Sequence, residues 1–310
     1  MNSDLIDRLR SNDQRTLSRV ISQIENNSDV NDEFFISIHE VSSSSLRIGV
    51  TGPPGAGKST LVDQLIREYL AINKSVGVLA VDPTSPFTGG ALLGDRVRMN
   101  HYEWNEDVFI RSMGSHGDLG GLARKAQEVG DVLAASGKEV IIFETVGVGQ
   151  GEYEVAKAVD LTVVVLVPES GDEIQMMKAG LIEIADLFVI NKSDREGAGR
   201  LGQLLKNALH SHTKPDLTEP PVFNTVATKQ EGIKELFNGM QNLLDAMVSN
   251  DRLIQKKLDR YRNRVLNLVQ ERLLDEFWTR EKRHQLEASI QALDSTRVAP
   301  HEVAQSLLNS

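Results

Sequence analysis

One stretch of the chain, from Leu46 to Leu70, restricts the fold more than any other. A short apolar segment, Leu46–Val50, leads into Gly52-Pro53-Pro54-Gly55-Ala56-Gly57-Lys58-Ser59-Thr60, and a helical pattern, Leu61–Leu70, follows. This loop matches G-x-x-x-x-G-K-[ST] between a strand and a helix, which is the context of a phosphate-binding loop (P-loop). Glycines allow successive N–H groups to point at phosphate oxygens, and a helix N-terminus favours negative charge. The stretch predicts a nucleoside triphosphate site in an α/β domain.

The residues of this loop have different expected roles. All of Gly52–Thr60 are candidate nucleotide contacts. Lys58 is a candidate catalytic residue that reaches the β- and γ-phosphates, and the Ser59 hydroxyl is expected to bind Mg²⁺. We expect Lys58 to lie at the surface, so that its removal opens no cavity in the core. The alternative is a glycine-rich turn with an accidental Lys-Ser pair, and the strand and helix on either side argue against it.

The segments after the P-loop alternate between short apolar runs and helix-length patterns. The apolar runs are Leu46–Val50, Val76–Val81, Val140–Phe143, Leu161–Val167, Leu187–Ile190 and Val222–Val226. Continuous apolar strands separated by helices are typical of a parallel sheet that is covered on both faces. The sequence therefore predicts an α/β fold with a doubly wound, mostly parallel sheet over residues 46–247.

Helical patterns flank this domain on both sides. Residues 1–45 carry apolar residues at spacings of three and four and predict a helical N-terminal extension. Residues 248–310 contain one long apolar stripe with charged residues opposite it. A stripe of this kind commonly packs on its own domain, and the alternative is an arm that forms a dimer. Its members are Leu253, Ile254, Leu258, Tyr261, Val265, Leu268, Val269, Leu273, Phe277 and Trp278.

Composition excludes several classes of protein. The chain has no cysteine, which rules out disulfide scaffolds, thiolate zinc sites and cysteine nucleophiles. Its net charge of -10 argues against nonspecific nucleic-acid binding. The longest apolar runs are far shorter than the roughly 20 residues that cross a bilayer, and the N-terminus lacks the pattern of a secretory signal. We therefore expect a cytoplasmic protein, with neither nucleic acid nor membrane among its partners.

The motif Asn191-Lys192-Ser193-Asp194 indicates which base is bound. It follows the strand Leu187–Ile190 at its carboxyl end, where ligands bind in open α/β sheets. The Asp194 carboxylate can accept from both N1–H and the 2-amino group of guanine, whereas adenine offers no such pair of donors. Asn191 can reach the purine O6/N7 edge, and the stem of Lys192 can lie over the ring. The sequence predicts GTP and GDP rather than ATP.

A second base-side loop is expected after the next strand, at Val226-Ala227-Thr228. Common GTPases have Ser-Ala at this loop, and here Val226 replaces the serine. The backbone N–H of Ala227 can still contact the purine O6, so we expect the substitution to be tolerated.

Acidic residues at strand ends and in one loop are candidate ligands of Mg²⁺, because this ion prefers oxygen ligands. Asp82 ends a strand, and Asp95 lies in the segment of residues 83–99, which is rich in glycine and proline. A helix cap or a turn remains an open alternative for both. Glu144 follows the strand Val140–Phe143, where many GTPases have the aspartate of Asp-x-x-Gly. Glu144 and Gly147 take the positions of that motif and join Lys58 as catalytic candidates.

Together these motifs resemble the MeaB/ArgK family of P-loop G proteins, which includes the human methylmalonic aciduria type A protein. Between Leu46 and Met247, D-P-[ST]-S-P-x-[ST]-G-G, L-G-D-R-x-R-M, E-T-V-G-V-G-Q, G-D-E-x-Q-x-x-K and N-K-x-D occur in the family's order. The resemblance implies a G domain of the SIMIBI type and a slow, Mg²⁺-dependent hydrolysis of GTP to GDP and phosphate. It further implies a homodimer in which residues 248–310 form the dimerisation arm.

The resemblance also implies a partner. Members of the family act as chaperones that gate cofactor loading and protect an adenosylcobalamin-dependent acyl-CoA mutase, chiefly methylmalonyl-CoA mutase. Asp172, Gln175 and Lys178 match a switch that senses nucleotide and partner, and an ordinary helix start is the alternative for them. The sequence departs from the family at His116, where an Arg is usual, and at Gly151, where a Ser is common. Arg96, Arg98 and Lys178 are candidates for added positive charge in the complex, and surface ion pairing is the alternative.

Two other functions compete with this interpretation. One is a P-loop kinase or ATPase linked to lysine, arginine and ornithine transport, against which the guanine motif argues. The other is a metal-insertion G protein, which typically carries tracts of His or Cys ligands. Seven scattered histidines and no cysteine make that class a poor fit.

Overall fold

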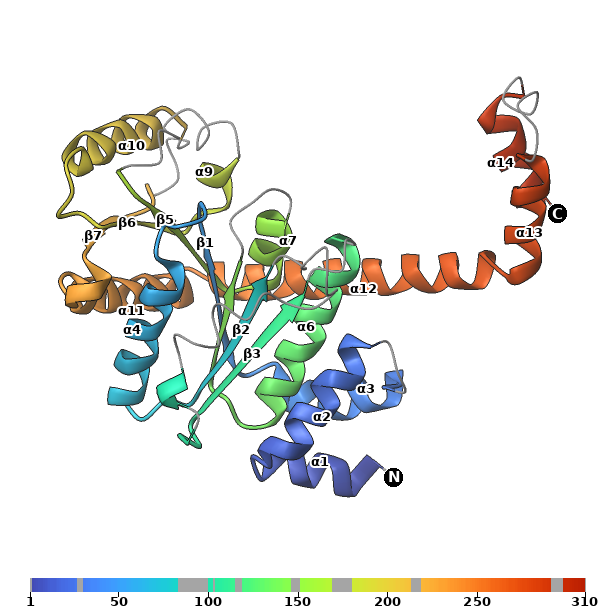
Figure 1. The fold of residues 1–310 in the computed structure, drawn as a ribbon, viewed down its shortest axis with the longest axis horizontal. Coiled ribbons are helices and arrows are strands. Elements are labelled where there is room, and N and C mark those ends of the chain that lie inside the picture. The colour runs from blue at the N-terminus through green and yellow to red at the C-terminus, as the bar shows by residue number, and fades with distance from the viewer. Residues whose placement is uncertain are drawn as a thin grey trace. The chain divides into compact units, whose positions relative to one another are not determined.

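The computed structural model describes residues 2–26, 30–82, 100–102, 104–114, 119–145, 151–168, 180–212, 219–290 and 298–309. Its contacts divide the chain into two compact units, Met1–Lys256 and Lys257–Ser310. Figure 1 labels most of the elements, and each unit is described by itself.

The larger unit is built on a parallel sheet. Among the described residues this sheet has seven strands in the order β3-β2-β4-β1-β5-β6-β7, and every pair of neighbours is parallel. The prediction of a doubly wound α/β fold is confirmed. The strands are β1 (Leu46–Thr51), β2 (Val76–Asp82), β3 (Val108–Gly114), β4 (Val140–Glu144), β5 (Leu161–Leu166), β6 (Leu187–Asn191) and β7 (Val222–Thr225).

Helices cover both faces of the sheet, which is why its central strands are apolar without alternation. Every residue of β4, β5 and β6 is buried. Ile142 packs with α4 and α11, whereas its neighbours Ile141 and Phe143 pack with α6 on the other face. The helices that flank the sheet in this domain are α4 (Lys58–Ala71), α6 (Leu119–Ala135), α7 (Gly151–Ala158), α9 (Leu181–Ile184), α10 (Ala198–His212) and α11 (Ile233–Ser249).

The strand β3 was not among the apolar runs that predicted the sheet. Among the described strands it lies at one edge of the sheet and pairs with β2 alone, from Val76↔Val108 to Asp82↔Gly114. An edge strand is covered less completely, so it tolerates Arg111 and Ser112 in its middle. These two adjacent polar residues leave β3 an apolar run of only three residues, and unlike β1 it has no recognised motif beside it.

The N-terminal extension forms α1 (Asn2–Arg10), α2 (Gln14–Glu25) and α3 (Asp32–Ser42). Asp13 caps α2 by accepting from the N–H groups of Arg15 and Thr16. Leu17, Val20 and Ile21 are buried in the same cluster as the apolar face of α6. Arg111 of β3 pairs with Glu25, so an ion pair also joins the extension to the sheet.

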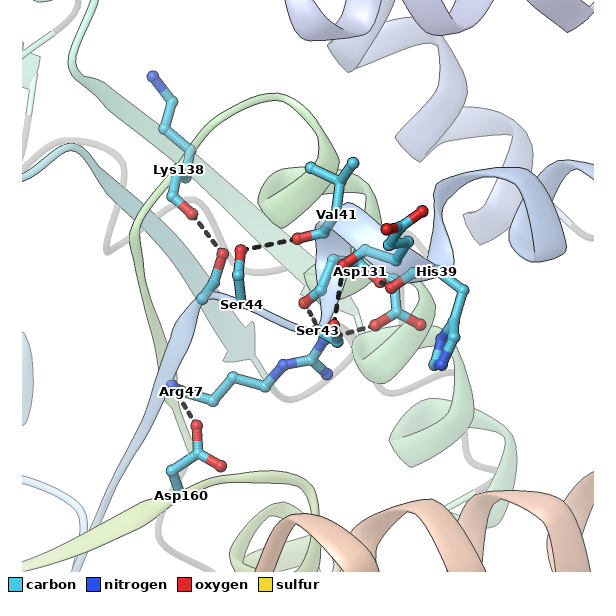
Figure 2. Close-up of polar contacts among 11 residues, drawn as sticks. His39, Val41, Ser43, Ser44, Arg47, Asp131, Lys138 and Asp160 are labelled. Atoms are coloured by element: carbon cyan, nitrogen blue, oxygen red, sulfur yellow. Dashed lines mark hydrogen bonds and ion pairs between the residues drawn. The ribbon is translucent and has the colours of Figure 1, made fainter. Parts of the chain in front are cut away.

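Arg47 joins the end of α3 to the sheet, as Figure 2 shows. Its backbone N–H donates to the buried Asp160 carboxylate at 2.9 Å, and its guanidinium donates to Asp131 of α6 and to the carbonyl oxygen of Ser42. The Arg47 side chain is only 5% exposed, and its charge is therefore matched by a carboxylate. This contact fixes where the extension meets the first strand.

The C-terminal part forms α12 (Arg252–Phe277), α13 (Arg280–Ser289) and α14 (Pro300–Asn309). Arg252 and Lys256, in the first turns of α12, pair with Asp186, which is 1% exposed. In the described chain α12 has no buried residue, and most of its apolar stripe is exposed. Leu253, at the start of the stripe, packs against the core of the larger unit, and both interpretations of the stripe stay open. No helix in the described part of the chain is long and apolar enough to span a membrane.

Candidate nucleotide-binding site

Positive φ angles shape the loop between β1 and α4. Gly52 has φ 136° and Gly57 has φ 86°, which are values that L side chains rarely adopt. A Cβ atom on Gly52 would lie 2.0 Å from the Val165 carbonyl oxygen, and one on Gly57 would lie 2.4 Å from Asn191 Nδ2. Both positions therefore require glycine for space as well as for conformation. The loop ends at the N-terminus of α4, and the N-terminus of a helix favours an anion.

Lys58 starts α4 and folds back over the loop. Its Nζ donates to the carbonyl oxygens of Gly52 at 2.8 Å and Pro53 at 3.1 Å. The residue is only 7% exposed, which corrects the expectation that it lies at the surface. The loop's own carbonyl groups hold the ammonium in a buried position, a contact that the sequence motif does not specify.

Ser59 and Glu144 meet where β1 and β4 end. The Ser59 hydroxyl donates to Glu144 Oε1 at 2.6 Å, and both residues are buried. Next to them, Thr145 Oγ1 donates to Thr51 Oγ1 at 2.8 Å. The backbone of Asp82 ends β2, the strand beside β4. A buried hydroxyl and carboxylate at one sheet edge supply the oxygen donors that Mg²⁺ prefers, so this pair fits the ion.

Other candidates from the sequence lie outside the described residues. These are Asp95 and Gly147 of the predicted metal and phosphate contacts, Asp172, Gln175 and Lys178 of the predicted switch, and Arg96, Arg98 and His116. Among the residues that the structure does describe, no group of three or more His, Cys, Asp and Glu side chains could hold a metal ion. The whole Mg²⁺ ligand set, Ser59 and Glu144 included, stays a prediction.

Asn191 connects the P-loop to the base-side loops. Its Nδ2 donates to the Ala56 carbonyl oxygen at 2.9 Å. Its Oδ1 accepts from Thr225 Oγ1 and from the backbone N–H of Ala227, each at 3.1 Å. The side chain is 3% exposed, so these bonds are shielded from water. Asn191 therefore links the P-loop, β7 and the second base-side loop. Its contact with the purine O6/N7 edge stays a prediction.

Asp194 lies at the rim of the site with a basic partner. Lys192, two residues before it, has φ 55°, a left-handed conformation that costs energy for a non-glycine residue. Lys229 Nζ lies 2.9 Å from Asp194 Oδ2. The hydrogen bond from Lys229 holds the pKa of the Asp194 carboxyl below its ordinary value, and the same bond raises the pKa of Lys229. Both groups are therefore ionised at neutral pH, and Asp194 is available as an acceptor.

The second base-side loop forms the short 3-10 helix η2 (Ala227–Lys229) directly after β7. Val226 is buried, and its backbone pairs with Glu231 in an antiparallel bridge. Ala227 is 2% exposed, and its N–H is the group that donates to Asn191. Val226, Ala227 and Thr228 thus lie in a closed turn beside Asn191, and their contacts with a base stay predictions.

The family is decided by a match over most of the chain. The model of the family described as "Methylmalonyl Co-A mutase-associated GTPase MeaB" matches residues 15–282. The chain belongs to the MeaB/ArgK family of GTPases. The resemblance that the sequence motifs indicated is confirmed.

Individual MeaB/ArgK relatives align with nearly the whole chain. A relative from Pyrococcus abyssi is 42% identical over 99% of this chain and 96% of its own length. The mitochondrial methylmalonic aciduria type A homolog of Mus musculus is 35% identical over 86% of this chain and 65% of its own length. The crystal structure of a LAO/AO transport system kinase is 27% identical, has a TM-score of 0.73, and covers 99% of this chain and 96% of that one.

The sequence motifs missed two residues of this MeaB/ArgK site. Thr225 ends β7 and donates to Asn191, and Lys229 pairs with Asp194. Neither belongs to a short motif with a fixed spacing from the P-loop, since both act across loops brought together by the sheet. The pairing of β6 with β7, Asn191↔Thr225, is what places them, and sequence alone does not give that register.

Proposed function

We propose that this chain binds GTP and GDP with Mg²⁺, hydrolyses GTP slowly, and uses that cycle as a chaperone. Its client is an adenosylcobalamin-dependent acyl-CoA mutase, either methylmalonyl-CoA mutase or a relative of it. The chain gates cofactor loading into this client and protects it from inactivation. The observation that carries the proposal is the match of residues 15–282 to a family described as mutase-associated GTPases.

The geometry supports binding of a guanine nucleotide. Gly52–Thr60 supplies N–H groups and Lys58 for the phosphates, and Asp194 supplies the carboxylate for N1–H and the 2-amino group. Asn191 holds the two halves in register through Ala56 and Ala227. The residues proposed to contact the base and those proposed to contact the phosphates thus lie together at the carboxyl edge of the sheet, where open α/β folds bind ligands.

Hydrolysis is attack of water on the γ-phosphorus, in which catalysis is mostly positioning and charge stabilisation. Lys58 neutralises charge that develops on the phosphate oxygens. Ser59 and Glu144, with Asp82 and Asp95 as further candidates, would hold Mg²⁺. The chemistry that this ion would supply is neutralisation of charge on the phosphates. Gly147 would donate its N–H to the γ-phosphate. No glutamine directly follows Gly147, and we expect slow turnover that the mutase accelerates.

We propose that the chain is a homodimer formed through its C-terminal arm. Seven members of the α12 stripe are large apolar side chains that are each 41–60% exposed: Ile254, Leu258, Tyr261, Val265, Leu268, Val269 and Leu273. An exposed apolar surface of this length indicates a partner surface. A second copy of this chain presents the same stripe, which suits a symmetric interface.

A second candidate function is a kinase or ATPase linked to amino-acid transport. The similarity to a structure described as a LAO/AO transport system kinase favours it. The charged carboxylate of Asp194 opposes it, because adenine has no donor pair to match. Comparison of ATP and GTP affinity separates the two candidates.

Co-purification tests the chaperone proposal. The tagged chain is mixed with methylmalonyl-CoA mutase in GDP, in a slowly hydrolysed GTP analogue, or without nucleotide, and the bound mutase is quantified. We expect the retained amount to depend on the nucleotide, because the switch region would differ between the two states. Retention that is equal in all three conditions, or absent in all three for every B12-dependent mutase tested, would reject the proposal.

A further inference from the structure

The rim of the base-side site carries an ion pair that no motif of the sequence includes. Lys229 Nζ lies 2.9 Å from Asp194 Oδ2, and the side chains are 54% and 39% exposed. Asp194 is the residue proposed to read the guanine N1–H and 2-amino groups. Lys229 is thus bonded directly to one of the two oxygen atoms that would meet the base.

The backbone beneath Lys229 is fixed by a closed turn. The Lys229 N–H donates to the Val226 carbonyl oxygen at 2.9 Å, and the Val226 N–H donates to the Glu231 carbonyl oxygen at 3.0 Å. Gly232 lies at the end of the turn with φ 73°. A Cβ atom there would lie 2.1 Å from the Asn224 carbonyl oxygen, so the position requires glycine. The lysine therefore extends from a rigid base instead of from an open loop.

The loop beneath Asp194 is tied to the same turn. The Ser193 N–H donates to the Thr225 carbonyl oxygen at 3.0 Å, and Asn191 Oδ1 accepts from the Ala227 N–H. The Asp194–Lys229 pair is thus a further connection between the loops at the rim, outside the bonds made by Ser193 and Asn191. This connection fixes the side chain of Asp194 and not only its backbone.

We propose that Lys229 is a positioning residue for guanine recognition, which holds the Asp194 carboxylate in the orientation that receives N1–H and the 2-amino group together. The inference rests on the proposed function, because it needs a guanine nucleotide as the ligand. A carboxylate oxygen has two lone pairs, so Oδ2 accepts from Lys229 and from the base at the same time.

The charges around the pair favour this arrangement. The Lys229 hydrogen bond is the main reason that the pKa of Asp194 lies below its ordinary value, and Arg195 adds to the effect. Asp194 and Glu231 in turn raise the pKa of Lys229. Both side chains keep their charges across the neutral range, so the orientation does not depend on pH there.

The test compares GDP with inosine diphosphate (IDP), which lacks the 2-amino group. Affinities of the full-length chain are measured by titration calorimetry at fixed Mg²⁺ and salt. Exposed ion pairs contribute modestly to free energy. We therefore expect Lys229→Met to lower the affinity for GDP about three- to tenfold and the affinity for IDP by less than about twofold. Lys229→Arg restores the charge and should restore most of the preference for GDP over IDP. Lys234→Met, an exposed lysine of α11, is the matched control and should leave both affinities unchanged.

Each outcome bears on the role of Lys229 in a different way. A loss in Lys229→Met that is equal for GDP and IDP would show that Lys229 only supports the fold of the loop, and it would overturn the inference. Unchanged or tighter GDP binding would overturn it as well, and tighter binding would mean that Lys229 competes with the base for Asp194. An unmodified chain that binds ADP as well as GDP would remove the proposed function together with this inference, whereas the two results above remove the inference alone.

Discussion

Replacement of Asn191 by alanine tests how the two halves of the nucleotide site are joined. The change removes one bond to the Ala56 carbonyl, one from Thr225 and one from the Ala227 N–H. All three partner residues are at most 2% exposed, so water cannot readily take the place of the amide. At about 1 kcal/mol for each bond, the total cost is roughly 3 kcal/mol.

This cost is divided between folding and binding. If all of it appeared in binding, GDP affinity would fall about 100-fold, since about 1.4 kcal/mol corresponds to a factor of ten. We expect at least about tenfold weaker binding of GDP and GTP alike, because both nucleotides need the two loops in register. A lower thermal midpoint of the nucleotide-free chain should account for the remainder.

The assay pairs calorimetric titration of GDP with thermal unfolding followed by circular dichroism. Asn207→Ala is the control, because Asn207 is an exposed asparagine of α10 whose side-chain oxygen accepts from Gln203 of the same helix. Asn191→Ala with parental GDP affinity and a parental thermal midpoint would refute the reasoning, since three buried groups cannot lose their partner without cost.

Other changes test the remaining parts of the site. Asp194→Asn should lower the affinity for GDP about tenfold or more and reduce the preference for GDP over ADP, because an amide offers one acceptor atom for two donors. Calorimetric titration with both nucleotides measures this change. Lys58→Ala should lower the GTP hydrolysis rate by about 100-fold or more in a phosphate-release assay, and a parental rate would show the phosphate assignment to be wrong. A chain that ends at Lys256 keeps the ion pairs of Arg252 and Lys256 with Asp186 and should be a monomer by light scattering. An intact chain that is already monomeric at micromolar concentration would contradict the proposed dimer. Lys178→Ala should keep the intrinsic hydrolysis rate but lose acceleration by the mutase, and full acceleration would reject a coupling role.

The buried strands and the P-loop were predictable because each leaves a local signature. Continuous apolar runs marked β1, β2, β4, β5, β6 and β7, and the glycine spacing of the P-loop reflects constraints on φ within a few residues. The edge strand β3 was missed because Arg111 and Ser112 leave it an apolar run of only three residues and no recognised motif lies beside it. The burial of Lys58 was missed because it depends on where the Gly52 and Pro53 carbonyl groups point.

The contacts between the two base-side loops were not predictable, because they join residues that are distant in the sequence. The Asn191–Asp194 motif indicated a guanine site, yet the bonds of Asn191 to Ala56 and Ala227 depend on strand order and register. Lys229 lies 35 residues from Asp194 and meets it only because β6 and β7 are neighbours. The apolar stripe of α12 gave two interpretations, packing on its own domain or forming a dimer, and periodicity alone does not choose between them.

The rate of GTP hydrolysis with and without an adenosylcobalamin-dependent acyl-CoA mutase tests the central claim most directly. The account predicts slow release of phosphate from GTP by the chain alone, a clear acceleration when methylmalonyl-CoA mutase or a relative is added to saturation, and little hydrolysis of ATP in either condition. Hydrolysis of ATP at a rate comparable to that of GTP, or a GTP rate that no such mutase changes, would contradict it.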